Sequence, residues 1–153
     1  MYYSKNGYKL TEGFESCKLK AYQDQGGVWT IAWGHTRGVT KGLTCIQLQA
    51  DAWLVEDIVF SEATVNDLVK VQINQNEFDA LVDFVFNVGI TSFETSSLLR
   101  LLNAGNFAEA AEQFDNWDHV KANGTEIVAA GLLRRREAET ADFQKAIDTE
   151  GAD

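Results

Sequence analysis

The stretch that decides the fold reads Phe14-Glu-Ser-Cys-Lys-Leu-Lys-Ala-Tyr-Gln-Asp-Gln-Gly-Gly-Val-Trp-Thr-Ile-Ala-Trp-Gly-His-Thr36. Its central part, residues 21–33, carries strand-forming side chains on both sides of Gln25-Gly26-Gly27. Glycine reaches positive φ without steric strain, so it suits a tight turn between two strands. The pattern therefore predicts a β-hairpin at the centre of this stretch.

Short elements are expected on either side of the hairpin. Residues 4–18 carry an apolar side chain every three or four positions, which predicts a short helix. Residues 34–42 are expected to form a loop, with a third short strand around Val39. The first third of the chain is thus predicted as a helix, a hairpin and a loop.

The rest of the chain is expected to be helical. The clearest periodic signal is Phe78, Leu81, Val82, Val85 and Phe86, which follow one helix face, and Gly89 stands where a left-handed C-cap would end that helix. The other predicted helices are about Thr44–Phe60 (with an extension toward Val69 left open), with an apolar face of Leu48, Ala52, Val55, Ile58 and Val59; Ser96–Asn103, closed by Gly105; a helix capped by Asn106 that carries Phe107, Ala110, Ala111 and Phe114; and Gly131–Ile147.

These elements predict an α+β fold that is mainly helical. We expect one domain over residues 1–153, with a small N-terminal β-hairpin lobe at about 10–60 and a larger helical lobe at about 70–147. Two lobes leave a cleft between them, and a cleft is a usual place for a functional site.

Composition excludes several classes of function. The chain has 13 basic and 23 acidic residues, a net charge of −10, so we expect no nucleic-acid binding, which requires a cationic face. It has no long apolar run and no apolar segment near Met1, so neither membrane insertion nor a secretory signal is expected. Residues 1–60 hold six basic and six acidic side chains, and residues 61–153 therefore carry the whole net charge.

Two carboxylates in the opening stretch are candidate catalytic residues. Glu15 lies near the end of the predicted helix, Asp24 lies on the hairpin, and Thr30 lies on the opposite strand. A pair of carboxyl groups in unlike environments is what glycoside hydrolysis requires, because one must hold a proton while the other stays ionised. Glutamate and aspartate pairs are also common on protein surfaces, so the residue types alone leave both interpretations open.

The spacing resembles a known catalytic signature. Glu15, eight residues, Asp24, five residues and Thr30, followed by Trp33-Gly-His-Thr36, resemble the signature of the phage-type lysozymes, glycoside hydrolase family 24. Further blocks that look like those of the family follow in family order across roughly residues 8–145: Val71–Leu81, Phe84–Gly89, Phe93–Asn103 and Gly131–Glu139.

This resemblance implies an endolysin that hydrolyses the β-1,4 bond between N-acetylmuramic acid and N-acetylglucosamine in peptidoglycan. It implies Glu15 as the general acid, with Asp24 and Thr30 holding the attacking water. The chain departs from the family in having Ser16, where many members have glycine after the glutamate. Glu12-Gly13 imitates that pair, but eleven residues separate Glu12 from Asp24, so Glu15 is the expected acid. Trp33 replaces a tyrosine that is common there, without affecting the chemistry.

Other side chains are candidates for the cleft or its support. Arg135 resembles the family arginine that pairs with the catalytic glutamate, and Arg136 is the next choice. His35 is either a cleft residue or a structural histidine bonded to an acidic partner. Phe86 and Trp117 are alternatively core residues. The expected substrate-binding residues are His35, Phe86, Asn87, Ser96 and Asn103.

No metal or cofactor is expected, since Cys17, Cys45, His35 and Asp24 lack the spacing of a metal site. The expected partner is peptidoglycan, and the enzyme is expected to be a monomer without an appended wall-binding module. It is expected to wait in the host cytoplasm until a phage holin, which it need not contact, lets it reach the periplasm. Two rival functions are a non-catalytic wall-binding module and a lytic transglycosylase.

Overall fold

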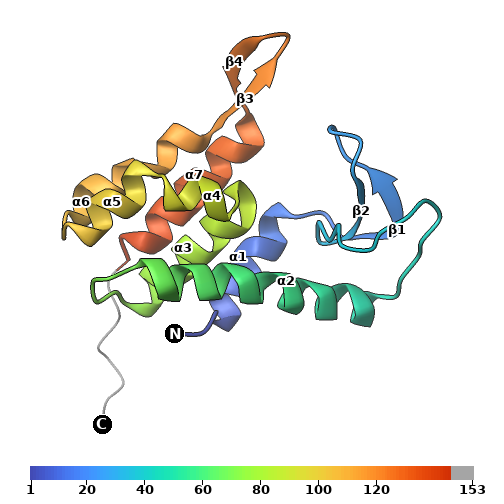
Figure 1. The fold of residues 1–153 in the computed structure, drawn as a ribbon, viewed down its shortest axis with the longest axis horizontal. Coiled ribbons are helices and arrows are strands. Elements are labelled where there is room, and N and C mark those ends of the chain that lie inside the picture. The colour runs from blue at the N-terminus through green and yellow to red at the C-terminus, as the bar shows by residue number, and fades with distance from the viewer. Residues whose placement is uncertain (146–153) are drawn as a thin grey trace.

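The computed structural model describes residues 1–145, and Figure 1 shows their arrangement. The elements in chain order are α1 (Lys5–Phe14), β1 (Lys18–Gln23), β2 (Trp29–Ala32), α2 (Gln47–Leu68), α3 (Gln75–Val88), α4 (Ile90–Glu94), α5 (Ser97–Asn103), α6 (Phe107–Glu112), a 3₁₀ helix (Phe114–Trp117), β3 (His119–Ala122), β4 (Thr125–Val128) and α7 (Ala130–Phe143). The predicted α+β class, mainly helical with a small N-terminal hairpin, is confirmed.

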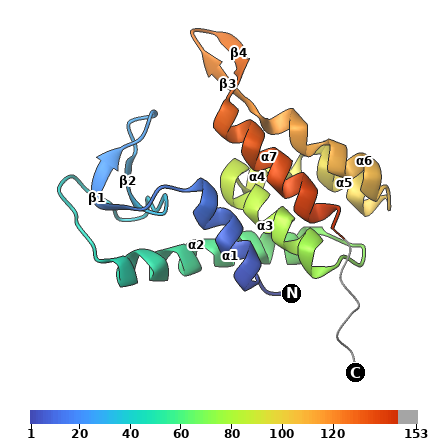
Figure 2. The same cartoon turned by 180° about the vertical axis from the view of Figure 1, so that it is seen from behind.

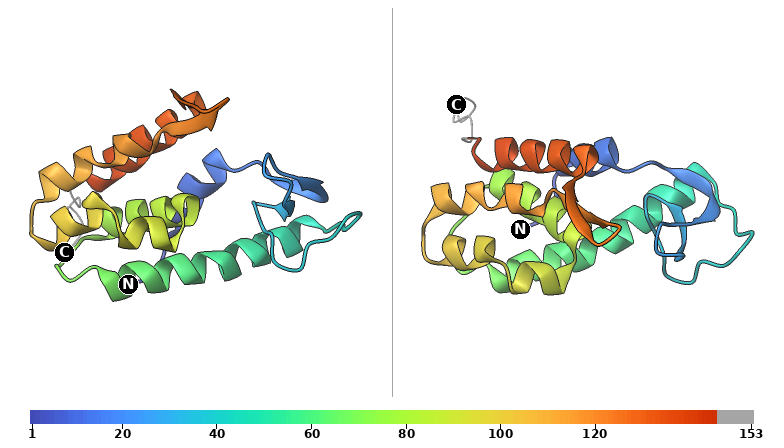
Figure 3. Two further views of the ribbon diagram at one scale, coloured as in Figure 1. Left: turned by 45° about the horizontal axis from the view of Figure 1, so that its top comes forward. Right: turned by 90° about the horizontal axis from the view of Figure 1, so that it is seen from above.

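The long helix α2 connects the two ends of the molecule. It begins beneath the β1–β2 hairpin and continues under the helical lobe, where it packs on α3 (Figures 1 and 2). α1 and α7 also pack on α3, and β3–β4 projects from the helical lobe (Figure 3). α3 is therefore the central helix of its lobe. Among residues 1–145, no helix is both long and apolar enough to cross a bilayer.

The β1–β2 hairpin has its own small core. The strands are antiparallel, and Tyr22 lies opposite Thr30. Ile31, Ala32 and Ala50 are fully buried there. The expected strand around Val39 is wrong: β1 is instead met by residues 43–45, through the backbone bonds from Ala21 N–H to Leu43 (2.8 Å) and from Cys45 N–H to Leu19 (2.9 Å).

The helical lobe is organised around α3. Phe78, Leu81, Val82 and Val85 are buried, which confirms the predicted apolar face. The Phe84 ring meets three aromatic rings edge-on, those of Phe93, Phe114 and Trp117, at centroid distances of 6.3, 5.2 and 5.7 Å. Burying each such ring contributes roughly 1.5–3 kcal/mol to folding. The core therefore fixes α3 firmly.

The predicted face of α2 is largely wrong. Leu48, Val55 and Val59 are exposed, whereas Ile58 is buried together with Ala50, Leu54 and Val65. α2 carries apolar residues on more than one side, and only the side toward the hairpin and α3 meets a core. Sequence periodicity could not choose between these sides.

Three element ends also differ from the predictions. The helix expected to reach residue 18 ends at Phe14, because Glu15 has an extended backbone (φ −94°, ψ 139°) that leads into β1. Gly89 does have positive φ (92°), but its ψ of 159° is not that of a left-handed cap, and the short helix α4 follows directly. α7 ends at Phe143, and Ile147 lies outside the described residues.

The expectation that everything after the loop is helical is also wrong. β3 and β4 form a second antiparallel hairpin between the 3₁₀ helix and α7. Asn123 and Gly124 both have positive φ (51° and 78°), as a tight type I′ turn requires. Asn-Gly between alternating apolar residues is a strong hairpin signal, so this element was readable from the sequence.

Candidate active site

Glu15 lies where the helical lobe and the first hairpin meet. It follows the last residue of α1, and its backbone N–H still donates to Thr11 O, at 3.0 Å. The side chain is 23% exposed, and its Oε1 accepts a 2.7 Å hydrogen bond from Arg135 Nη1. Glu15 is thus held by the last helix while remaining accessible.

Arg135 is shared between two carboxylates. Besides Glu15, it binds Asp83 of α3 in two places, from Nε to Oδ2 at 2.9 Å and from Nη2 to Oδ1 at 2.8 Å. The guanidinium also lies over the Phe14 ring, 5.7 Å from its centroid. These contacts use the three nitrogens of the guanidinium, so its position relative to Glu15 is fixed.

The neighbouring arginines have different surroundings. Arg134 is exposed and Arg136 is fully buried. Arg136 Nη2 donates to Asn87 Oδ1 at 2.7 Å and to Glu139 Oε1 at 3.0 Å. Three successive arginines on α7 therefore point in different directions, and Arg135 is the one that meets Glu15.

Electrostatics differ sharply within this buried group. Burial raises the pKa of Asp83, but the charge and hydrogen bonds of Arg135 outweigh it, so the pKa lies below its usual value. Burial lowers the pKa of Arg135, but the charges and hydrogen bonds of Asp83 and Glu15 raise it by more, so the net shift is upward. Burial, reinforced by Asp83, raises the pKa of Glu139 well above its usual range. Asp83 and Arg135 are therefore a stable ion pair, whereas Glu139 favours its protonated form.

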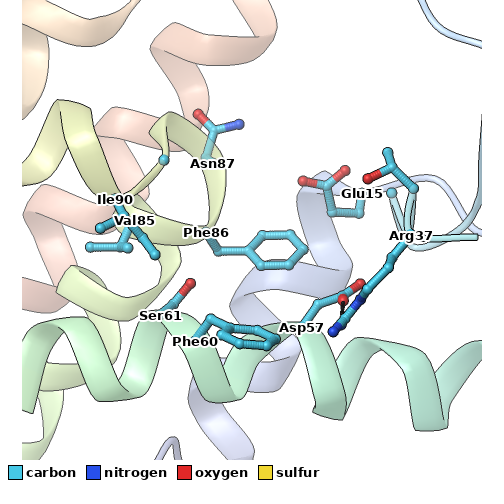
Figure 4. Close-up of a pocket in the computed structure, with 12 residues that line it drawn as sticks. Glu15, Arg37, Asp57, Phe60, Ser61, Val85, Phe86, Asn87 and Ile90 are labelled. Carbon is cyan, nitrogen blue, oxygen red and sulfur yellow. Dashed lines mark hydrogen bonds and ion pairs between the residues drawn. The ribbon is translucent and has the colours of Figure 1, made fainter. Parts of the chain in front are cut away.

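A pocket of about 510 Å³ opens on one side of Glu15 (Figure 4). The Phe86 ring projects from α3 into it, between Glu15 and Phe60 of α2. Asn87 lines the same pocket, as does Arg37, which binds Asp57 at 3.1 Å. The pocket thus combines aromatic rings with polar groups, as small-molecule binding sites usually do.

A second hollow of about 340 Å³ lies on another side of Glu15. It is formed by the end of α1 and the start of α7, including Phe14, Leu132 and Arg134. Glu15 and Asn87 line both hollows. The carboxyl group of Glu15 therefore stands between two spaces that an extended ligand can occupy.

Asp24 is held by its own turn. Its Oδ1 accepts from the N–H groups of Gly26 and Val28, both at 2.9 Å, while the side chain is exposed. Thr30 is buried, and its hydroxyl donates to Val28 O at 3.0 Å. Burial raises the pKa of Tyr22, and the charges of Glu15 and Asp24 raise it further. The pKa of Tyr22 thus responds to the charges of both carboxylates of the predicted pair.

The chain is similar to known proteins over most of its length. The family described as phage lysozyme matches residues 12–139. An endolysin of Acyrthosiphon pisum secondary endosymbiont phage 1 is 42% identical over 146 residues, which cover 95% of this chain and all of the relative. The chain belongs to the phage lysozyme family.

Two further proteins are similar over nearly their whole length. The endolysin of Salmonella phage P22 is 37% identical over 148 residues, covering 94% of this chain and 98% of that protein. The muramidase domain of SpmX from Asticaccaulis excentricus superposes with a TM-score of 0.91 at 39% identity, covering 95% of this chain and 99% of that domain.

Three predicted cleft residues of this phage lysozyme family member have structural contacts instead. His35 is buried, its Nδ1 lies 2.8 Å from Asp57 Oδ2, and its ring stacks on Trp53. The hydroxyl of Ser96 is buried and caps α5 at Leu99 N–H (3.1 Å). The amide of Asn103 bridges Leu68 O and Lys70 N–H, at 2.9 and 2.7 Å. Neither Ser96 nor Asn103 lines the two hollows beside Glu15, and the contacts of His35 are those of its alternative structural role.

Asp83 is the site residue that sequence reasoning missed. It lies within the apolar run of α3, four positions after Asp79, and both are buried. Two acids spaced by one helical turn inside an otherwise apolar face need buried partners, and that was the available signal. Trp117, by contrast, packs on the core as the alternative interpretation expected.

The described residues contain two free cysteines and no cluster of metal-binding side chains. Cys17 and Cys45 are both half-buried free thiols. Burial raises the pKa of Cys45, and the neighbouring Cys17 adds to this. Within residues 1–145, no three His, Cys, Asp or Glu side chains gather as a metal site would need.

Proposed function

We propose that this chain is an endolysin, a lysozyme-type glycoside hydrolase that cleaves the β-1,4 bond between N-acetylmuramic acid and N-acetylglucosamine in peptidoglycan. Membership of the phage lysozyme family supports this function. The observation that carries it is the place of Glu15, a half-buried carboxyl group between two hollows, held by Arg135.

Glu15 is the general acid in this proposal. Cleavage requires a proton on the glycosidic oxygen as the bond to the anomeric carbon breaks. A polysaccharide that lies across both hollows brings its linking oxygen to the carboxyl group between them. Arg135 holds Oε1 at 2.7 Å, which leaves Oε2 to carry the proton toward the sugar.

Asp24 and Thr30 position the attacking water. Tyr22 and Thr30 are directly opposed in the hairpin, and Asp24 lies two residues beyond Tyr22, so Asp24 and Thr30 are diagonal neighbours. Such neighbours lie about 7–8 Å apart, enough for one water between their side chains. The turn binds Asp24 Oδ1, so Oδ2 is the oxygen that accepts the water's proton. The Thr30 hydroxyl is a further acceptor for that water.

Phe86 and Asn87 are the substrate-contacting residues in this account. The Phe86 ring offers an apolar surface for the face of a sugar ring, and Asn87 offers an amide for hydroxyl or N-acetyl groups. Arg136 orients that amide by binding Asn87 Oδ1. The side-chain amide NH₂ group of Asn87 is left to donate to the substrate.

The enzyme acts on the cell wall as a monomer and needs no bound cofactor. It is made in the host cytoplasm and reaches peptidoglycan in the periplasm after a phage holin opens the inner membrane, without direct contact with the holin. Neither nucleic acid nor membrane insertion takes part.

Mass spectrometry of digested, purified peptidoglycan tests this function. Fragments with reducing N-acetylmuramic acid ends are the expected products. Products with 1,6-anhydro ends would instead indicate a transglycosylase. Intact glycan with retained binding of the protein would indicate a wall-binding module.

A further inference from the structure

Asp83 is a buried carboxylate with an unusually complete set of partners. It is fully buried on α3 and, within residues 1–145, does not line either hollow beside Glu15. Its Oδ1 accepts from the Thr11 hydroxyl at 2.6 Å and from Arg135 Nη2, and its Oδ2 accepts from Arg135 Nε. Because Thr11 uses its proton on Asp83, the Tyr3 hydroxyl donates to Thr11, at 2.8 Å.

This arrangement addresses a difficulty with the proposed acid. An arginine that binds a carboxyl group at 2.7 Å favours the ionised form, whereas a general acid must start with its proton. Asp83 is a second carboxylate on the same guanidinium, and its negative charge offsets the positive charge that Glu15 experiences.

We propose that Asp83 is a positioning residue that lets Arg135 orient Glu15 while Glu15 retains its catalytic proton. The inference rests on the proposed role of Glu15. Asp83 occupies two nitrogens of the guanidinium, whose rigid fork then presents Nη1 to Glu15. It thereby supplies both the direction of the contact and a compensating negative charge.

Other groups contribute to the field at these side chains, and the experiment must account for them. Glu139 is the most important, because its Oε1 lies 3.6 Å from Arg135 Nε and it can ionise in place of a lost Asp83. Further titratable or charged neighbours of Asp83, Arg135 and Glu15 are Tyr3, Asp79, Arg136 and Asp142 around the buried pair, and Tyr22, Asp24, Arg37, Asp57 and Arg134 on the side of Glu15.

The test compares pH–activity profiles of the full chain and of Asp83→Asn on purified peptidoglycan at constant ionic strength. The alkaline limb reports loss of the acid's proton. Without the Asp83 charge, Arg135 stabilises ionised Glu15, so this limb should move to lower pH by about one unit or more. kcat should also fall by up to about a hundredfold, with little change in KM, because the acid is less well oriented.

A double variant and a matched control sharpen the comparison. Asp83→Asn combined with Glu139→Gln removes the substitute carboxylate, so the limb should move at least as far as in the single variant. Asp79→Asn is the control: Asp79 is also buried on α3, but it binds Ser4 and Gln75. Its loss should lower the melting temperature and leave the limb in place.

The proposal is overturned if the alkaline limb of folded Asp83→Asn stays in place or moves to higher pH. That result would show that Asp83 only anchors Arg135, because loss of the anchor would release Arg135 from Glu15 and remove its positive charge from the acid. Carboxyl ¹³C NMR of the unmodified chain gives a second test that needs no variant to fold. Asp83 should be ionised at the pH of full activity, and a protonated Asp83 there would contradict the proposal. Failure of the proposed function looks different, because the unmodified chain would then give no reducing muramic ends.

Discussion

Glu15 and Arg135 are 120 positions apart in the chain, yet they are joined by a 2.7 Å hydrogen bond. Their contact depends on α3, because Asp83 binds the same guanidinium from that helix. At the scale of single residues, the candidate site is a line of hydrogen bonds from Tyr3 through Thr11, Asp83 and Arg135 to Glu15. Each link is a group whose proton or charge the next group requires.

The first prediction at this scale concerns the stereochemistry of cleavage. If Asp24 and Thr30 hold a water on the face opposite Glu15, the anomeric centre should invert, as in enzymes whose carboxyl groups lie about 6.5–9.5 Å apart. Proton NMR of the first-formed anomer from a soluble oligosaccharide measures this. A retained β-anomer, or a covalent adduct on Asp24, would exclude the water-positioning role.

A second prediction follows from the buried Glu139. Burial raises its pKa in the folded protein well above the ordinary value of 4.5, so the folded state keeps a proton that the unfolded chain releases. The resulting stability is present below the ordinary pKa and is lost as pH rises through the folded pKa. Glu139→Gln has no such proton to lose, so its melting temperature should gain on that of the unmodified chain as the pH rises above the ordinary value of 4.5. A constant difference would mean that Glu139 is ionised and paired with Arg136.

How far the sequence predicts the site depends on where each signal lies. Glu15, Asp24 and Thr30 are predicted from their spacing within one local stretch, and Arg135, whose contact with Glu15 the structure does show, from a recognisable block. Ser96 and Asn103 lie in similar blocks, but their side chains bond to backbone groups of their own lobe. Asp83 has no motif of its own, and its role appears only when α3 and α7 come together.

At the scale of elements, local chemistry explains most of the boundaries. Asn74 and Glu77 form a reciprocal capping box that starts α3, and Ser4 caps α1 through the N–H groups of Asn6 and Gly7. Four of the five residues predicted for the apolar face of α3 are buried, so that face was predictable, although the helix is buried on every side from Phe78 to Val85. The face of α2 was not predictable, because its apolar residues surround the helix and tertiary packing chooses among them.

A matched pair on α2 tests that choice. Ile58 is fully buried, whereas its neighbour Val59 is 50% exposed. Ile58→Ala should therefore lower the free energy of unfolding by about 2–5 kcal/mol. Val59→Ala should change it by no more than about 0.5 kcal/mol, because it leaves no cavity. Equal losses in urea denaturation would show that α2 is packed through a different face.

At the scale of the whole molecule, charge and substrate oppose each other. The chain has a net charge of −10, carried by residues 61–153, and peptidoglycan is itself anionic. Three basic residues follow one another near Glu15, namely Arg134, Arg135 and Arg136. Arg135 and Arg136 are buried and their charges are used in hydrogen-bonded ion pairs. Long-range encounter with the wall should therefore be repulsive, even though the site itself is accessible.

Salt dependence should reveal this repulsion. Salt screens charges over about 8 Å at 0.15 M, so activity on cells stripped of their outer membrane should rise from very low to moderate ionic strength. Turbidity clearing at a fixed enzyme concentration measures this salt dependence.

The same protein added to untreated Gram-negative cells should cause no lysis without a chelator or chloroform. A fall in activity with salt, or lysis of untreated cells, would indicate a cationic or membrane-active surface instead.

The central claim is that Glu15 supplies the proton for glycoside cleavage, and a pair of neighbouring substitutions tests it most directly. Glu12 lies one turn earlier on α1 and is exposed, so Glu12→Gln is the matched control for Glu15→Gln. Turnover should be measured by the release of reducing muramic ends from purified peptidoglycan, with folding checked by circular dichroism. Glu15→Gln should lose about 10²–10⁴-fold or more in turnover, because an amide has no proton to donate, while Glu12→Gln keeps most of its activity. An active Glu15→Gln beside an inactive Glu12→Gln would contradict the account.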